Sequence, residues 1–431
     1  MAGSASESFE PLDWAALASE AAPALAAPAF TNPATGPTNP QALWRLFGRP
    51  KAEVRVTLYR DHHAWCPYCQ KVWLWLEERR VPYRIRKVTM YCYGTKEPWY
   101  TELVRGGMLP ALELDGRLIT ESDRILEALE AAFGPLGLGM NAREALPLRQ
   151  LERQLFRAWC QWLCVPSRGM AEEARGQEGF DRFAERFATA LSTNPGPFLL
   201  GELGTVDLIF VPYVERMNAS LAYYKGYLLR DRHPAIDRWF HALEQRSTYL
   251  GTQSDFHTHA HDLPPQMGGC HASGTPEQRD LAQRIDAGPW PVVAPPGSDP
   301  ETSQSEPADA AGVALARVLR HRKTLLARNP LGEAGLDWPL RCALTRLITG
   351  RACPPPAGSA RGLRYLRDRI SVPRDMPLHA ARLLRRCLEA TACLDPADPT
   401  AAGEPIPMQH RRDQDPSPFL TAANPSSGAS L

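Results

Sequence analysis

The sequence predicts a mixed α/β domain followed by an all-α bundle and a further helical region. Residues 54–90 read as strand, helix and strand, because alternating apolar side chains give way to apolar spacings of three and four and then return. Residues 141–250 show helical spacing throughout, and that spacing returns over 311–395 after a stretch rich in Pro, Gly and Ser. The 431 residues are enough for two or three domains with cores of their own.

The composition is that of an ordinary globular protein and sets few limits on function. The hydrophobic fraction is 44%, the charged fraction is 23% and the net charge is +1, so global charge implies no partner. No run of about 18 apolar residues predicts a membrane-spanning helix, and the N-terminus lacks a basic region followed by an apolar core. We therefore expect a cytoplasmic protein whose ten cysteines are mostly free thiols. Inert, buried thiols are expected at Cys160, Cys164, Cys342, Cys387 and Cys393.

Local signals place the elements of the α/β domain. An arm rich in Ala and Pro holds one short helix near Trp14, and regular order is expected to begin near Val54. Asp115-Gly116 is a tight-turn signal between two short strands, and Ser122 is the expected N-cap of the next helix. The expected elements are strand 54–60, helix 66–80, strand 83–90, an irregular segment 91–100, strands 111–115 and 117–120, and a helix from residue 121.

The predicted domain boundaries follow the shifts in composition. The third helix of the bundle is expected from about Asp207 to Tyr227, within a bundle of four long helices. The regions are an arm 1–50, an α/β domain 51–137, an all-helical bundle 141–250, a His-containing loop and low-complexity linker 251–309, a basic helical extension 310–395 and a disordered tail 396–431.

The closest cysteine pair, in Cys66-Pro67-Tyr68-Cys69, stands at the start of a predicted helix. Free N–H groups and the positive end of the helix dipole stabilise a thiolate at Cys66, and Pro67 suits a first helical turn. Cys69 lies one turn later and can attack a mixed disulfide at Cys66, so Cys66 is predicted as the attacking thiol and Cys69 as the resolving thiol. Two other interpretations stay open, an inert pair and a zinc site that shares the nearby donors Cys92, His62 and His63.

Two further signals lie downstream of the cysteines. A cis bond between Leu109 and Pro110 would turn the Leu109 main chain outward to pair with an extended cysteinyl peptide, although an ordinary trans proline fits the sequence as well. Glu121 and Ser122 open a helix whose N–H groups and hydroxyl can bind a carboxylate, with Glu121 pairing with an amino group. The simpler interpretation of Ser122 is a helix cap.

The order of these three signals, CPYC, then LP, then ES, resembles the N-terminal domain of the glutathione transferase superfamily. The resemblance implies a thioredoxin-like domain followed by an all-α bundle, with glutathione as the cofactor. Cys66 would take the catalytic position, Leu109 and cis-Pro110 the main-chain clamp, and Glu121 with Ser122 the γ-glutamyl site. CPYC itself resembles a glutaredoxin, and the nearest likeness is the iota-like group of photosynthetic organisms, which has a CPxC motif and a C-terminal extension.

The sequence departs from the family pattern at two places. Gly204 stands three residues before Asp207, where the family usually has Ser or Thr. Glutaredoxins often carry a basic residue before the first cysteine, but here it is Trp65, so the thiolate would depend on the helix end or on Arg60 or Lys71.

A cysteine in the catalytic place favours glutathione-dependent thiol transfer or reduction, with Cys66 forming a mixed disulfide with glutathione. The substrate would be a small molecule or a protein thiol, and the family allows a homodimer. Tyr59 and Tyr68 keep glutathione conjugation as an alternative, and Tyr68 is counted with the glutathione-binding residues. A non-enzymatic alternative is an iron–sulfur cluster or haem bound at the CPYC site.

Two clusters lie outside the motif. His257, His259 and His261 would share one face of an extended segment, with Cys270-His271 downstream, but a polar, partly exposed loop is favoured over a metal site. Residues 311–395 carry 16 Lys and Arg against 6 Asp and Glu. We expect this basic extension to dock on the acidic remainder, with an acidic protein or an anionic membrane surface as alternative partners and no nucleic-acid partner.

Overall fold

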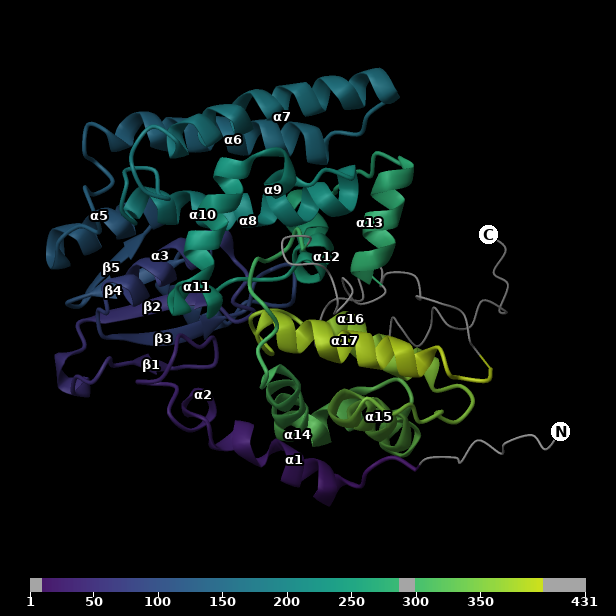
Figure 1. Cartoon of the computed structure of the whole chain (residues 1–431). Helices are drawn as coiled ribbons and strands as arrows, with labels where there is room; N and C mark the ends of the chain where they lie inside the picture. Colours follow the sequence, from purple (N-terminus) through teal and green to yellow (C-terminus); the bar gives the residue numbers. More distant parts are fainter. Residues whose placement is uncertain (1–9, 287–298, 398–431) are drawn as a thin grey trace, which may run out of the picture.

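The computed structural model describes residues 10–286 and 299–397. A five-stranded sheet and the helical bundle form one part of the molecule, and the C-terminal helices lie beside them together with the first N-terminal helix (Figure 1). The elements of the sheet domain are β1 Trp44–Arg45, a 3₁₀ turn Lys51–Glu53, β2 Val56–Asp61, α3 Pro67–Glu78, β3 Tyr83–Val88, α4 Pro98–Leu103, β4 Ala111–Leu114, β5 Arg117–Thr120 and α5 Ser122–Phe133.

The sheet has the strand order β1-β3-β2-β4-β5. β2 and β3 run parallel and the other neighbours run antiparallel, with Leu58 opposite both Ile85 and Leu112. These side chains are buried because alternate residues of each strand face the helices. The predicted β-α-β and β-β-α units are therefore confirmed, and together they form a thioredoxin-like sheet.

Two expectations for the first 125 residues are wrong. Order begins well before Val54, because β1 extends the sheet by pairing with β3 and the arm contains α2 Pro28–Thr31 after the helix expected near Trp14, which is α1 Trp14–Ala26. The N-cap of α5 is Glu121, not Ser122, which is already the first helical residue. A strand of two residues is too short to show the alternation on which strand prediction depends.

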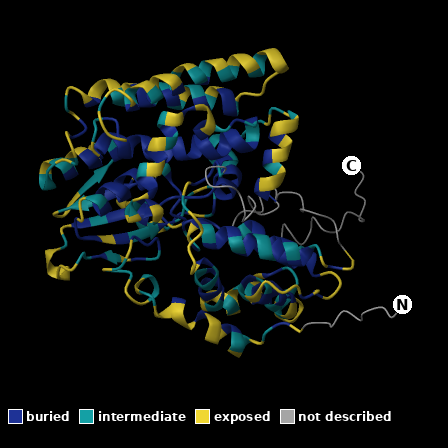
Figure 2. Cartoon of the chain, viewed as in Figure 1, coloured by how far each residue is buried: buried dark blue, intermediate teal, exposed yellow. Residues whose placement is uncertain are grey.

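The bundle surrounds one central helix. α8 is buried along nearly its whole length, whereas α7 exposes one face (Figure 2). The start of α8 lacks the usual capping hydroxyl, but Asp207 still accepts hydrogen bonds from Gly204 N at 3.0 Å, Leu199 N at 3.1 Å and Trp239 Nε1 at 3.0 Å. The bundle helices are α6 Ala145–Cys164, α7 Met170–Leu191, α8 Thr205–Lys225, α9 Leu229–Arg232, α10 Pro234–Glu244 and α11 Ser247–Leu250.

The loop predicted over 251–309 contains two helices, α12 Phe256–Met267 and α13 Pro276–Asp286. α12 begins at Asp255, whose carboxylate accepts a hydrogen bond from Thr258 N at 2.9 Å. Both helices pack against α8 and against each other. The three histidines are consequently buried on a helix instead of sharing one face of an extended loop. The low-complexity stretch 287–298 and nearly all of the predicted tail, 398–431, lie outside the described residues.

The basic extension forms a second core that also includes the arm. Leu17 and Ala21 of α1 are buried among the C-terminal helices, so residues far apart in the sequence form one unit (Figure 1). Buried ion pairs join the extension to the region after the bundle, Arg385 with Asp255 and Arg382 with Glu301 at 3.4 Å. These contacts agree with the expected docking of basic on acidic surfaces. The extension helices are α14 Ala310–Arg328, α15 Gly332–Thr349, α16 Ala360–Arg369 and α17 Leu378–Ala392.

Among the described residues, every helix is either too short or too polar to cross a membrane.

Candidate active site at Cys66

Cys66 is the N-cap of α3, and Pro67 occupies the first helical position. Gln70 N donates to the Cys66 carbonyl at 3.0 Å, which begins the helical ladder directly after the cysteine. Trp65 N donates to Asp61 Oδ2 at 2.6 Å, and this bond ties the loop before Cys66 to the end of β2. Cys66 therefore lies at the N-terminus of α3, the end of the helix dipole that favours a negative charge.

Both motif thiols are reduced and buried, with exposed fractions of 5% for Cys66 and 1% for Cys69. Burial raises the pKa of the Cys69 thiol well above its usual range, and its hydrogen bond with Cys66 raises it further. Cys69 is therefore held as a neutral thiol beside Cys66.

A cavity of about 530 Å³ opens beside Cys66, a volume typical of ligand sites. Of the predicted residues, it is lined by Cys66, Tyr68 and Leu109, and by Pro67 of the same motif. The other walls come from residues 90–92, 107 and 108, from the bundle and from the last turn of α12. Its remaining lining residues are Trp65, Met90, Tyr91, Cys92, Lys96, Gly107, Met108, Phe156, Trp159, Tyr213, Arg216, Leu263, Pro265, Gln266 and Met267.

Four predicted site residues do not line this cavity. Cys69 lies behind Cys66, and Pro110 follows Leu109 through the predicted cis peptide bond. Glu121 has the positive φ of 67°, a backbone conformation that is costly for a residue with a side chain and that often marks functional sites. Ser122 is buried at the first position of α5.

Two cations line the cavity, and neither is among those expected to act on the thiolate. The guanidinium of Arg216, from α8, donates to the Trp65 carbonyl and to Gln70 Oε1 at 3.0 Å. Burial lowers the Arg216 pKa, while the charges of Glu215 and Cys66 act in the opposite direction. Lys96 lies over the ring of Tyr91 at 4.6 Å, and burial lowers its pKa as well.

The residues expected to stabilise the thiolate or activate glutathione have other contacts. Arg60 donates to the Pro40 carbonyl at 2.7 Å, and its guanidinium covers the Trp73 ring. Lys71 pairs with Asp123. Tyr59 donates to Glu113 Oε2 at 3.1 Å. None of these three side chains lines the cavity, whereas Tyr68 does.

A buried histidine supports the loop before Cys66 from the other side. Trp65 Nε1 donates to His259 Nδ1 at 3.1 Å, and His259 Nε2 lies 2.8 Å from Glu215 Oε1. Because the tryptophan N–H can only donate, Nδ1 must accept and Nε2 must carry the proton that goes to Glu215. Burial lowers the His259 pKa, which agrees with this neutral form.

The zinc interpretation of the cysteine pair finds no support in the geometry. Among the described residues, the one group of three His, Cys, Asp or Glu donors within 4.8 Å of one another is His257, His261 and Asp286, which lies outside the cavity. Cys92 does line the cavity, where it contacts Gln266.

Sequence reasoning therefore named one wall of the cavity, including Cys66, but not Lys96, Arg216 and His259. The adjacent charges of Glu215 and Arg216 in an otherwise apolar helix were a usable signal, because buried charges are rarely placed without a partner. Lys96 lies in a segment without periodicity, and no comparable signal marks it.

Comparison with known proteins agrees with this arrangement. Residues 65–132 match the glutathione S-transferase N-terminal domain, and residues 170–242 match the glutathione S-transferase C-terminal domain. The chain is 26% identical over 191 residues to glutathione S-transferase DHAR3, chloroplastic, and to glutathione S-transferase DHAR2, both of Arabidopsis thaliana. These alignments cover 44% of this chain, and 69% and 84% of the two relatives.

Solved structures align with slightly less than half of the chain. Glutathione transferase Omega 3C of Trametes versicolor is 27% identical, with a TM-score of 0.40 over 47% of this chain and 90% of its own. Dehydroascorbate reductase of Chlamydomonas reinhardtii is 20% identical, with a TM-score of 0.39 over 46% of this chain and 93% of its own. Both family matches end before residue 243, so they leave out α12, α13 and the extension. Both domains of the glutathione transferase superfamily are therefore matched in this chain, over residues 65–132 and 170–242.

Proposed function

We propose that this protein is a glutathione-dependent thiol transferase and reductase in which Cys66 is the nucleophile. The observation that carries the proposal is a cysteine at the N-terminus of α3, lining a cavity of about 530 Å³ between the sheet domain and the bundle. A cysteine in this position reacts with sulfur itself, whereas a conjugating enzyme must leave the glutathione thiolate free. The CPYC motif and the helices after residue 250 lead us to propose a place beside the iota-like group.

The reaction has two exchange steps. The Cys66 thiolate attacks the glutathionyl sulfur of a mixed disulfide, the S–S bond breaks, and the substrate leaves as a thiolate that takes up a proton. A second glutathione, deprotonated, then attacks the glutathionyl sulfur on Cys66, which releases oxidised glutathione and restores the thiolate. The net change converts one mixed disulfide and one glutathione into a free thiol and oxidised glutathione, so electrons and protons balance.

The environment of Cys69 favours this route over one through an internal disulfide. Resolution by Cys69 needs its thiolate, but burial keeps the Cys69 pKa well above its usual range. Glutathione in the cavity meets no such obstacle. We therefore propose that Cys66 turns over with a second glutathione and that Cys69 is a neutral neighbour during catalysis.

The family positions suggest how glutathione is held. The Leu109 main chain, next to Cys66 on the cavity wall, would pair with the cysteinyl part of the tripeptide. Glu121 and Ser122, at the start of α5, would bind the γ-glutamyl end, where free helix N–H groups favour a carboxylate. Tyr68, 39% exposed at the cavity, is placed to contact the ligand.

Paired cysteine variants test the mechanism. Cys66→Ser should lower kcat/KM for reduction of a glutathionylated peptide by at least about 10³-fold, because the attacking atom is lost. Cys69→Ser should keep at least half of the wild-type rate and should form the Cys66–glutathione mixed disulfide to the same extent as the wild type, read as a mass increase on the Cys66 peptide. Full activity of Cys66→Ser would overturn the proposal, and loss of activity in Cys69→Ser would show that the internal disulfide is required.

Substrate assays sharpen the assignment. Dehydroascorbate can react at the same thiol, because the Cys66 thiolate adds to its carbonyl and glutathione then attacks the sulfur, leaving ascorbate and a Cys66 mixed disulfide. Both reductions should be lost together in Cys66→Ser. Conjugation of glutathione to an aromatic halide should be weak in the wild type. If conjugation is the fastest of the three and survives in Cys66→Ser, the chain is a conjugating transferase.

A further inference from the structure

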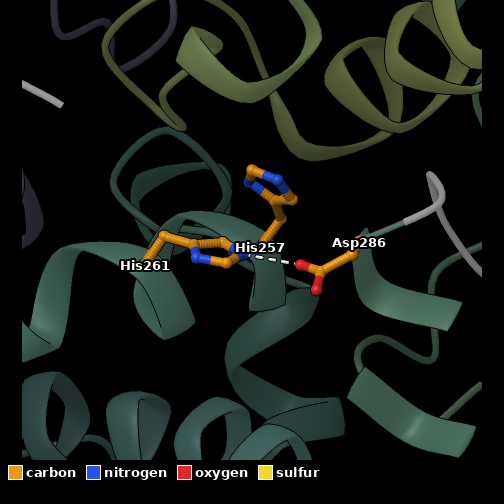
Figure 3. A group of neighbouring side chains, drawn as sticks. All are labelled: His257, His261 and Asp286. Carbon is orange, nitrogen blue, oxygen red and sulfur yellow. Dashed lines mark hydrogen bonds and ion pairs between the residues drawn. The ribbon is translucent and has the colours of Figure 1, made fainter. Parts of the chain in front are cut away.

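A second cluster of reactive side chains lies outside the thiol cavity. His257 and His261 are one turn apart on α12 and face Asp286, the last residue of α13 (Figure 3). One donor atom from each of the three lies within 4.8 Å of the other two. His261 Nε2 is 2.6 Å from Asp286 Oδ1, and the two imidazole rings are 4.6 Å apart between centroids. All three residues are buried.

The fold holds these donors in place. An i, i+4 pair of histidines on one helix puts both rings on the same face. Tyr223, from α8, donates to the second oxygen of Asp286 at 2.9 Å, which fixes the carboxylate while Oδ1 faces the histidines. Such hydrogen bonds to a ligand's free atom are a regular part of metal sites in proteins. The helices themselves are fixed by the small apolar core beneath them, formed by Ala219, Ala222, Tyr223, Phe256, Ala260, Leu281 and Ile285.

The electrostatic surroundings favour a cation at this place. Asp368, on α16, provides a second carboxylate at the edge of the cluster, with its Oδ1 3.8 Å from His257 Nε2. Arg367 donates to that same oxygen at 2.6 Å and also pairs with Glu389. Two carboxylates, Asp286 and Asp368, thus lie beside the histidines, and Arg367, which pairs with Asp368, is shared with Glu389.

We propose that His257, His261 and Asp286 bind a divalent transition metal ion, with Zn²⁺ as the preferred ion. Two imidazole nitrogens and one carboxylate oxygen match the ligand types that Zn²⁺ takes, and they leave a fourth position for Asp368 or water. Ca²⁺ and Mg²⁺ are disfavoured because they prefer an all-oxygen ligand set. The ion would join α12 to α13 and, through Asp368, to the extension.

Metal binding is expected to stabilise the wall of the thiol cavity without entering its chemistry. Leu263, Gln266 and Met267 of α12 line that cavity, only a few residues beyond His261. His259, between the two proposed ligands, contacts Trp65 and Glu215 instead. The metal should therefore act on stability and on the position of α12, because the thiols and the histidine cluster lie on different sides of that helix.

Titration of the metal-free, full-length protein with Zn²⁺ and Co²⁺ tests the proposal. The wild type should bind one ion per chain at this site and gain thermal stability. The Co²⁺ complex should show visible d–d bands without sulfur-to-metal charge transfer, which separates this site from the cysteines. His257→Gln and Asp286→Asn should each weaken binding by at least about tenfold, whereas His241→Gln, an exposed histidine beside Ser303, should bind as the wild type does.

The control for folding is the melting temperature without metal. Asp286→Asn keeps an oxygen and an amide in place of the carboxylate, so the chain should fold and differ from the wild type chiefly in its response to Zn²⁺. The proposal is overturned if both ligand variants bind as tightly as the wild type, or if the Co²⁺ spectrum shows thiolate ligation alone. Absence of any binding to the wild type overturns it as well.

Discussion

The histidines on the two sides of α12 have different surroundings: His259 lies near an open cavity, whereas His257 and His261 lie among packed charged groups. Toward the sheet domain, His259 makes neutral hydrogen bonds to Trp65 and Glu215 and stands beside a cavity of about 530 Å³. Toward the extension, His257 and His261 lie among carboxylates and arginines that are packed together. A site for an exchanging ligand needs open space beside its reactive group. A site for a tightly bound cation instead needs several ligating atoms that point to one place.

This difference also shows what the additional helices do. The family domains provide Cys66 and most of the cavity, and α12 closes one side of that cavity with Leu263, Pro265, Gln266 and Met267. The opposite side of the same helix is attached to α17 through Asp255 and Arg385. α12 therefore contacts both the extension and the thiol cavity, and changes on each side should separate the two roles.

The largest expected effect is on stability and concerns the ion pair that joins α12 to α17. Arg385→Met should lower the free energy of unfolding by about 3–5 kcal/mol, because it leaves the buried Asp255 carboxylate without its ion pair. Asp255 also caps α12, so the loss should loosen both faces of that helix. Urea unfolding followed by tryptophan fluorescence measures the change.

The matched control removes an equal charge from an exposed pair. Arg49, 3.9 Å from Glu53, has a side chain that is 62% exposed. Arg49→Met should change the free energy of unfolding by less than about 0.5 kcal/mol. Equal losses in the two variants would mean that the buried pair does not hold α12 to the extension.

The sequence predicted the sheet domain well and α12 badly, for physical reasons. Alternation over residues 54–60 and the Asp115-Gly116 turn are local signals, because the alternation within a strand shows which of its side chains are buried. In α12, the polar histidines and the prolines 264 and 265 are typical of a loop. The helix forms because its N-cap, Asp255, is fixed by Arg385 and because Phe256 and Ala260 pack against α8. Such tertiary contacts produce no periodic pattern of apolar residues in the sequence.

In the candidate site too, the residues with a local sequence signal were predicted and those brought in by the fold were not. Cys66 and Cys69 were predicted because a CxxC at a helix start has a chemical meaning of its own. Lys96, Arg216 and His259 reach Cys66 and its loop from three other segments, and only the fold brings them together. Such positions become predictable once the packing of the bundle on the sheet is known.

The next effect is on turnover and concerns the charge of Arg216 in the cavity beside Cys66. Arg216→Met should lower kcat/KM for mixed-disulfide reduction by roughly tenfold, because the cavity loses a cation that favours the thiolate. Arg216→Lys should recover part of the rate, since it restores the charge without the fork-shaped contacts to Trp65 and Gln70. A pH–rate profile distinguishes the two roles, because the rate rises with pH as the attacking thiol becomes a thiolate, and only loss of the Arg216 charge should shift that acidic limb.

A smaller effect concerns the pH dependence of stability through His259. Burial lowers its pKa, so the unfolded chain binds the proton more readily than the native protein does. The resulting stability is present above the unfolded pKa of about 6.5 and is lost as pH falls below it, at up to about 1.4 kcal/mol per pH unit. His259→Gln keeps an acceptor for Trp65 and a donor for Glu215 but does not titrate. Its unfolding free energy, measured by urea titration from pH 7.5 to 5, should therefore fall less steeply than that of the wild type.

Cys92 should matter least, although it lines the same cavity as Cys66. Burial and the Asp262 carboxylate together raise the Cys92 pKa to about 12, so the thiolate is scarce at neutral pH. Cys92→Ser keeps an acceptor for Gln266 and should change turnover by less than about twofold. In the wild type, alkylation of Cys92 by iodoacetamide should still rise about tenfold per pH unit from pH 8 to 10, whereas an ordinary thiol levels off. A plateau below pH 9, or a large loss of turnover in Cys92→Ser, would show that the cavity holds two reactive thiols.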